Sequence, residues 1–263
     1  MNGFRFNTDK FDFWPIYEAI KKYYPIGVEI DPEFYRSYSG HAELINILSE
    51  KVHNDENYTS IWTNFENKLA LNTGKTVIGT SYGQNFCYSA TLVVTEEVHN
   101  NFTYRNLIHF FVSFLGPFYC VIGESQNELK INQDEQLPRS GYLSTNYLVA
   151  SPYGDFVSLF KTVEQFIEAA FEGYKFIPYW INEQVITGLY LHHQNQNQNP
   201  TVFNVLFNDH IVLNNQRYPS AGDLSYRSED WFKTGYDPSK EGRWSVYPPL
   251  SALKGMDNEI STD

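Results

Sequence analysis

The residue of this sequence best placed for catalysis is a histidine in an apolar segment. His109 stands in the run Leu-Ile-His-Phe-Phe, residues 107–111, and Arg105 lies four residues before it. Because side chains alternate along a strand, both would point to one face of a sheet. A partly buried imidazole is readily tuned to titrate near neutral pH, as a general base requires. We favour a hydrogen-bonded core histidine and predict no catalytic residue, with His109 the general base to test if the chain is an enzyme.

Three other histidines were considered as metal ligands. His192 and His193 are adjacent, and His210 follows Asp209 in a segment that we expect to pair with theirs. Adjacent residues of a strand point to opposite faces, so at most one of the two could serve a shared ion. The spacing matches no established metal site. We therefore predict no metal and no cofactor.

Two further motifs give no support for catalysis. Residues 72–76, Asn-Thr-Gly-Lys-Thr, end like a phosphate-binding loop, but the first glycine of that motif would fall at Leu69, inside a predicted helix. Cys87 and Cys120 are flanked by aromatic and aliphatic residues, which predicts buried free thiols, with a disulfide or a reactive pair as the alternative.

An acidic row on a predicted helix breaks a local rule. Glu164, Glu168 and Glu172 follow one another at i, i+4 and i+8, where like charges destabilise a helix by about 0.2–0.5 kcal/mol per pair. Glu172 also opposes the negative end of the helix dipole, and only Lys161 relieves the row. Such a departure predicts a partner-binding surface, with an ordinary solvated face as the alternative.

A second acidic cluster follows from the strands described below. If these strands form a meander, the first and third run in one direction and bring four glutamates to the same end of the sheet. The predicted cluster consists of Glu96, Glu97, Glu124 and Glu128. Together with the helical row, it makes up our predicted partner-binding residues.

Amphipathic helices are predicted in residues 1–75. The first follows Asp12, the second follows the start signal at residues 31–33, and both carry apolar residues at helical spacing. The third carries Trp62, Phe65 and Leu69 on one face and is followed by a glycine stop. We therefore expect three helices before the first strand.

Residues 76–217 are predicted to hold the sheet and a packing helix. Alternating apolar residues predict strands at 86–94, 108–114 and 118–122, joined as an antiparallel meander. Residues 125–150 are polar and predict a long surface loop. An apolar stripe over residues 155–172 predicts a long helix that starts at an Asp155 N-cap and docks on the sheet.

The last part of the chain is predicted to be less regular. Residues 184–191 and 202–207 are expected to form a hairpin around a Gln/Asn-rich loop. Residues 218–263 show no clean period but are rich in aromatic rings, which seldom stay exposed. We predict an irregular segment pinned to the body of the protein.

The length and composition favour one folded domain. At 263 residues the chain is near the upper limit for a single hydrophobic core, and 17% aromatic residues are untypical of disordered chains. The predicted fold class is α+β over residues 1–263. It has N-terminal helices, then an antiparallel meander sheet with a long amphipathic helix packed on it, then a hairpin and an aromatic-rich segment.

The charge and the apolar runs limit partners and location. A net charge of −12 repels phosphate backbones and anionic lipid head groups, so neither nucleic acid nor membrane is a predicted partner. The chain has no apolar run long enough to cross a bilayer, and its first residues lack a secretory-signal pattern. We therefore predict a cytoplasmic protein.

The predicted function is that of an acidic protein that binds a basic protein partner. One setting is an immunity protein that neutralises a basic toxin such as a nuclease. The alternative is an enzyme or a small-ligand module, for instance one that stacks carbohydrate in an aromatic-lined pocket. A structural or oligomerisation subunit is a third class. A concave pocket that joins His109 or His210 to a carboxylate would favour the enzyme or ligand-binding class.

Overall fold

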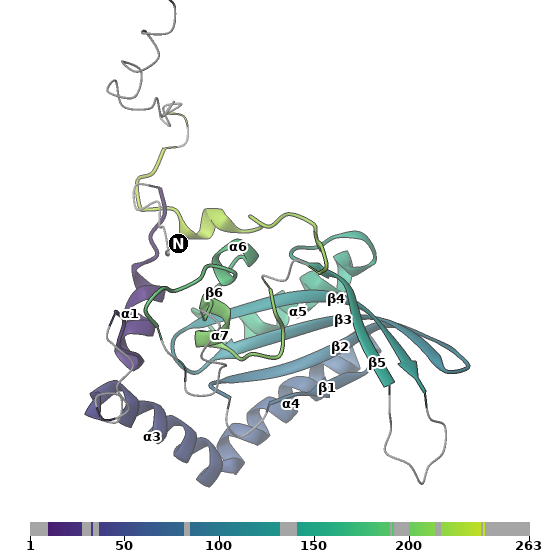
Figure 1. Ribbon diagram of the computed structural model, residues 1–263, viewed down its shortest axis with the longest axis horizontal. Helices are drawn as coiled ribbons and strands as arrows, with labels where there is room; N and C mark the ends of the chain where they lie inside the picture. Colours follow the sequence, from purple (N-terminus) through teal and green to yellow (C-terminus); the bar gives the residue numbers. More distant parts are fainter. Residues whose placement is uncertain are drawn as a thin grey trace, which may run out of the picture. The chain divides into compact units, whose positions relative to one another are not determined.

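The fold is described from a computed structural model (Figure 1). The structure describes residues 10–27, 33, 37–81, 85–131, 141–189, 191, 200–213, 217–237 and 239. Residues 1–232 and 233–263 form two separate units, and all elements named below lie in the first. The single domain over residues 1–263 stays a prediction.

The N-terminal part is helical, as predicted. Helices α1 (Trp14–Tyr23), α3 (Ser39–His53) and α4 (Asp55–Thr73) precede the first strand. The Trp14 N–H donates to Asp12 Oδ1 at 3.3 Å, so Asp12 does hold the start of α1. Gly74 ends α4 in the left-handed region, at φ +62°, which a glycine adopts without steric cost.

A mostly antiparallel sheet forms the centre of the first unit. Its strands are β1 (Val77–Gly79), β2 (Cys87–His99), β3 (Phe102–Ser113), β4 (Phe118–Lys130) and β5 (Gly141–Val149), with the short β6 (Lys175–Phe176) and β7 (Ser220–Ala221). The order is β1-β2-β3-β4-β5-β7, and β6 pairs in parallel with β4. This arrangement confirms the predicted α+β fold with a meander.

The predicted loop over residues 125–150 is wrong. β4 continues to Lys130, and β5 pairs with it antiparallel from Gly141 to Val149. Residues 132–140 lie outside the described residues. Both strands are polar here, with Ser125 and Gln126 buried. Hydrophobic periodicity could not detect them because backbone pairing, not an apolar face, defines this end of the sheet.

Helices α4 and α5 (Val157–Ala170) cover one face of the sheet (Figure 1). The Trp62 ring of α4 stacks on Tyr88 of β2, with ring centroids 4.8 Å apart. Phe160 and Ile167 of α5 are fully buried against the same cluster, so the predicted docking of this helix is confirmed. The predicted Asp155 cap is wrong: Asp155 lies in a short 3-10 turn, η1 (Gly154–Phe156), and its side chain makes no cap bond.

The opposite face of the sheet is covered at one end only. Helices α6 (Tyr179–Asn182) and α7 (Val202–Leu206) pack there with α1 in a second apolar cluster. Phe111 of β3 contacts Phe203 of α7, with ring centroids 5.1 Å apart. Cys87 and Cys120 are buried in this cluster as free thiols, as predicted. The other end of this face has no helix over it in the described part of the chain.

The predicted hairpin at residues 184–191 and 202–207 is also wrong. Residues 202–206 form α7, and only an isolated bridge between Val185 and Thr201 remains of the pairing. Thr201 and Asn204 form a reciprocal capping box that starts this helix. Four of its five residues are buried. Because the apolar run is short and buried nearly all round, its hydrophobic pattern does not distinguish a helix from a strand.

The aromatic segment after β7 is pinned to the body, as predicted, up to Phe232. The 3-10 turn η2 (Ser228–Trp231) buries Trp231 completely, and its indole N–H donates to the Phe176 carbonyl oxygen at 2.7 Å. A bridge joins Phe232 to Phe11. Residues 240–263 lie outside the described residues.

Candidate functional site

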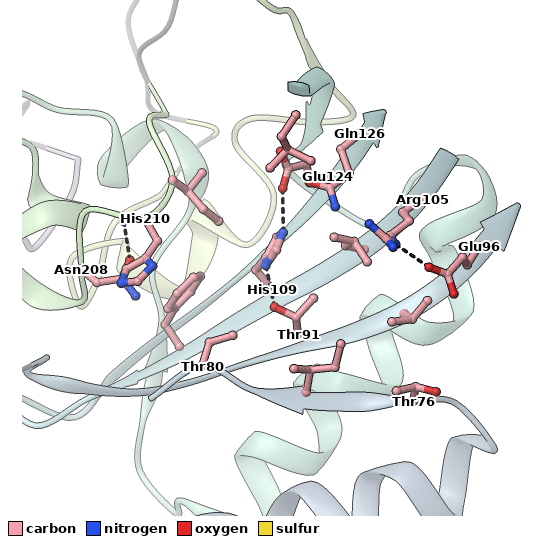
Figure 2. Close-up of a pocket in the computed structure, with 16 residues that line it drawn as sticks. Thr76, Thr80, Thr91, Glu96, Arg105, His109, Glu124, Gln126, Asn208 and His210 are labelled. Atoms are coloured by element: carbon pink, nitrogen blue, oxygen red, sulfur yellow. Dashed lines mark hydrogen bonds and ion pairs between the residues drawn. The ribbon is translucent and has the colours of Figure 1, made fainter. Parts of the chain in front are cut away.

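A cavity of about 470 Å³ lies over the half of the sheet that α6 and α7 leave uncovered. We call it the sheet cavity. It is lined from β1 to β5 and by the segment after α7, and Figure 2 shows His109 and Glu124 near its centre. Its volume is typical of small-ligand sites, about 300–1,000 Å³. Most of its residues are strand residues, so their side chains are held by a rigid ladder.

The strand register brings the polar side chains of the sheet cavity together. Thr91 of β2 lies opposite His109 of β3, and Leu107 of β3 lies opposite Glu124 of β4. His109 and Glu124 are therefore diagonal neighbours on one face, within reach of long side chains. Thr145 of β5 completes the row because β5 pairs with β4 along its polar half.

These residues form a hydrogen-bonded chain across four strands. Thr91 Oγ1 lies 2.9 Å from His109 Nδ1, and His109 Nε2 lies 2.9 Å from Glu124 Oε2. The Thr145 hydroxyl donates to Glu124 Oε1 at 2.5 Å. Burial by itself would raise the pKa of Glu124, but the bonds from His109 and Thr145 and the charge of His109 outweigh it and lower that pKa. Glu124 is thus held as a carboxylate.

A second polar group lies further along the same face. The Arg105 side chain donates through Nε to Glu96 Oε1 at 2.5 Å and through Nη1 to Glu128 Oε2 at 2.7 Å. Burial would lower the pKa of Arg105, but the bonds and charges of the two glutamates outweigh it and raise that pKa. Each glutamate keeps a second oxygen for which no bond is found among the described residues. Arg105 thus links β2, β3 and β4 while each of its two carboxylate partners keeps one oxygen available to accept a hydrogen bond.

Gln126 stands beside Arg105 and has no hydrogen-bond partner for its amide in the described part of the chain. It lies opposite Arg105 in the β3–β4 register and lines the sheet cavity. Only 8% of its surface is exposed. Figure 2 shows its amide on the side of the sheet that carries Glu124 and Arg105. Its amide atoms are not fully sealed from solvent, so a group that enters the sheet cavity can reach them.

All four members of the predicted acidic cluster lie at the same end of the sheet, as predicted. Glu96, Glu124 and Glu128 meet on one face at one end of the sheet. Glu97 lies opposite Tyr104 and so points to the other face, where His99 Nε2 is 3.8 Å from its carboxylate. The charge of Glu96, Glu124 and Glu128 is offset in part, since one arginine, Arg105, pairs with two of them and His109 with the third.

The acidic row of α5 differs from the prediction more strongly. Glu164 is buried, with 4% of its surface exposed, and it accepts from Tyr226 at 3.0 Å. Glu168 accepts from the Arg227 guanidinium at 2.6 Å, and Glu164 lies 3.5 Å from the same group. Glu168 and Glu172 are exposed, but Glu172 lies beyond the end of α5 at Ala170. Sequence spacing could not reveal this because Arg227 comes from a segment far along the chain.

Burial dominates the titration of Glu164. It raises the pKa of this carboxyl to about 7, although Tyr226 and Arg227 act in the opposite direction. Arg227 compensates only in part because it also bonds Glu168 and Asp230. The row is therefore a structural contact between α5 and the segment before η2. The partner-binding role of the seven predicted glutamates stays a prediction.

The described residues contain no cluster of three or more His, Cys, Asp or Glu side chains that could hold a metal ion. His210 lies at the edge of the sheet cavity, and its Nε2 is 3.4 Å from Asn85 Nδ2. His192 and His193 lie outside the described residues. The His109–Glu124 pair supplies only two metal-ligating side chains.

Comparisons with protein-family models, with curated proteins and with solved structures find no match to this chain. None of the helices in the described ranges is long and apolar enough to cross a membrane. A function for this chain is therefore inferred from the geometry of the sheet cavity alone.

Sequence reasoning found the members of the site but not their association. His109 was chosen as a candidate base and Glu124 as part of an acidic cluster, while Thr91, Gln126 and Thr145 were missed. The turn at Gly116-Pro117 was a usable signal, because it joins β3 and β4 as a hairpin and so places residue 109 near residue 124.

Proposed function

We propose that this chain is a binding protein that recognises a basic protein partner through the sheet cavity. The observation that carries the proposal is the acidic group on the uncovered half of the sheet, where Glu96 and Glu128 both bond Arg105 beside the cavity. The contact between His109 and Glu124 in the same cavity favours the enzyme or ligand-binding class instead. Concave sites with a few convergent polar groups on a rigid frame are typical binding sites.

The charge of the site supports a basic partner. Three glutamates, Glu96, Glu124 and Glu128, stand around the sheet cavity or at its edge, against one arginine, Arg105. The whole chain carries −12, which draws a cationic partner by long-range attraction. An immunity protein that neutralises a basic toxin is one setting in which such a protein would act.

Binding explains the site better than acyl-transfer chemistry. Both imidazole nitrogens of His109 are bonded within the protein. The strands around Thr91 are paired on both sides through β1 and β3, so their backbone N–H groups serve the ladder rather than an oxyanion. Among the described residues, Phe111 is the one Phe, Tyr or Trp that lines the sheet cavity, so there is little aromatic surface on which a carbohydrate could stack.

The partner class is tested by enrichment from extracts of the protein's own host. Val93→Phe would fill the floor of the sheet cavity, and Val52→Phe, on an exposed position of α3, is the matched control. We expect the wild type and the control to retain one basic protein at low salt and to lose it progressively toward physiological salt. The Val93→Phe variant should not retain the basic protein. Thermal unfolding of this variant should show a cooperative transition, as expected of a folded protein.

Two results would contradict the proposal. Retention of the same partner by a folded Val93→Phe variant would place the interface elsewhere. Association that does not weaken between low and physiological salt would contradict the electrostatic part of the proposal. Loss of the partner on changing Glu172 to Gln instead would return the interface to the exposed end of α5.

A second candidate function, general-base catalysis, is favoured by one observation. Thr91, His109 and Glu124 follow one another as hydroxyl, imidazole and carboxylate, the order found in nucleophile–base–acid sites. Hydrolysis of a simple activated ester that disappears in both Thr91→Val and Glu124→Gln would support this candidate. Equal background rates in wild type and variants would remove it.

A further inference from the structure

We propose that Gln126 is the hydrogen-bond anchor of the sheet cavity, and that with Glu96 and Glu128 it binds the cationic end of an arginine or lysine side chain. This inference rests on the proposed function and names the group that enters the cavity. Gln126 is more than nine-tenths buried, lines the cavity, and has an amide without a partner among the described residues. The amide atoms are not sealed from solvent, so a ligand group in the cavity could bond them in place of water.

The neighbours of Gln126 supply the acceptors that a cation needs. Arg105 lies opposite Gln126 and uses Oε1 of Glu96 and Oε2 of Glu128. Within the described residues, the second oxygen of each glutamate has no bond. These two oxygens and the Gln126 carbonyl are acceptors on one side of the sheet. Guanidinium and ammonium groups are pure donors, with five and three N–H bonds respectively, and so match such a set.

The apolar part of the sheet cavity suits the stem of the same side chain. Val93, Leu107 and Leu143 line it between and beside the charged groups. Lysine and arginine bury their methylene stems against apolar surface while the charged end reaches polar groups. A short polar ligand would leave these residues without contact.

The charges around the sheet cavity favour a cationic ligand over an anionic one. Arg105 is already bonded to two carboxylates, and Glu124 is held in its charged form. An incoming carboxylate or phosphate would meet a guanidinium whose charge is already offset by two glutamates, in a chain of charge −12. A cation enters without breaking either ion pair, so the sheet cavity favours it.

The test titrates the full chain with capped tripeptides Gly-Arg-Gly, Gly-Lys-Gly, Gly-citrulline-Gly and Gly-Glu-Gly, read by the methyl resonances of Val93 and Leu107. We expect the arginine or the lysine peptide to shift these methyls with a Kd on the order of 1 mM. Citrulline keeps the shape of arginine without its charge and should bind about tenfold more weakly. The ratio of the arginine and lysine affinities tells which source of the cation is preferred.

Two substitutions at Gln126 separate ligand binding from a structural role. Gln126→Leu keeps the volume and removes the amide, so it should weaken binding of the cationic peptide about tenfold. Gln126→Glu should strengthen it. Because Gln126 has no partner to lose in the described structure, Gln126→Leu should leave the Tm unchanged or raise it. Gln165→Leu, at an exposed position on α5, is the matched control and should change neither property.

The outcomes distinguish this inference from the proposed function. Equal affinity of wild type and Gln126→Leu for the cationic peptides would overturn the inference, as would tighter binding of the citrulline or glutamate peptide. In either case the proposed function stands if Val93→Phe still abolishes partner binding. If Val93→Phe retains the partner and no peptide shifts the methyls of the sheet cavity, both fail.

Discussion

His109 Nε2 lies 2.9 Å from Glu124 Oε2, across the boundary between β3 and β4, and the two side chains are 15% and 13% exposed. The pair stands on the only half of this sheet face that the described helices leave uncovered, in a cavity where a ligand could reach it. A close pair of this kind in an apolar strand region is stabilising only while both partners are present, because removal of one leaves the other buried and unpaired.

Glu124→Gln should destabilise the protein in a pH-dependent way. The pKa of Glu124 is lowered from its ordinary value of 4.5, so its contribution is present above that value and is lost as the pH falls through the lower, folded-state pKa. We expect the variant to be less stable than wild type by about 1–3 kcal/mol at pH 7. Urea unfolding should show that the difference in unfolding free energy between wild type and variant becomes smaller below about pH 4.5. A difference that stays constant from pH 7 to pH 3 would argue against a charged Glu124.

Glu164→Gln should show the opposite pH dependence. The pKa of Glu164 is raised to about 7, so its contribution is fully present below 4.5 and is lost as the pH rises through 7. Relative to wild type, the variant should gain about 1–3 kcal/mol between pH 5 and pH 8. Glu172→Gln, at an exposed position in the turn after the same helix, is the control and should show no such trend. If the stability of the variant relative to wild type falls as the pH rises, Glu164 is held as a carboxylate in the folded protein.

Arg227→Ala should loosen the segment between β7 and η2. The Arg227 guanidinium bonds Tyr119, Glu168 and Asp230, and it does so from a left-handed backbone, φ +61°, that non-glycine residues rarely adopt. Its loss leaves Glu164 buried without its cation, which should lower stability by about 2 kcal/mol or more.

The measurement for Arg227 is thermal unfolding together with limited proteolysis around residues 225–232. Arg227→Lys keeps the charge but cannot bond three partners from one planar group, so it should recover only part of the lost stability. Full recovery by lysine would show that charge alone, rather than the guanidinium geometry, ties this segment to α5.

The two cysteines should be unreactive in the native protein. Burial raises the pKa of Cys87 to about 12 and raises that of Cys120 as well, so neither forms a thiolate near neutral pH. A thiol reagent at pH 8 should label both rapidly in denaturant and only at the rate of unfolding without it. Fast labelling of one cysteine in the folded protein would contradict its burial.

Much of the fold followed from local sequence patterns. The spacing of Trp62, Phe65 and Leu69 determined an amphipathic helix, and the apolar residues at every second position from 108 to 114 determined a strand, because side chains on one face recur with a period of 3.6 or 2. Where both faces of an element were polar, or both were apolar, the hydrophobic pattern predicted the wrong secondary structure. The polar ends of β4 and β5 were predicted as a loop, and the mostly apolar residues 202–206 were predicted as part of a strand.

The site depended on tertiary structure to a greater degree. The sequence by itself determined the acidic charge, the apolar setting of His109, and the presence of glutamates near the end of the third long strand. Only the register of β3 with β4 decided that His109 meets Glu124, and only the return of residues 225–231 to α5 decided that Arg227 neutralises Glu168. Local periodicity places a side chain on a face, whereas pairing between distant segments decides which charge it meets there.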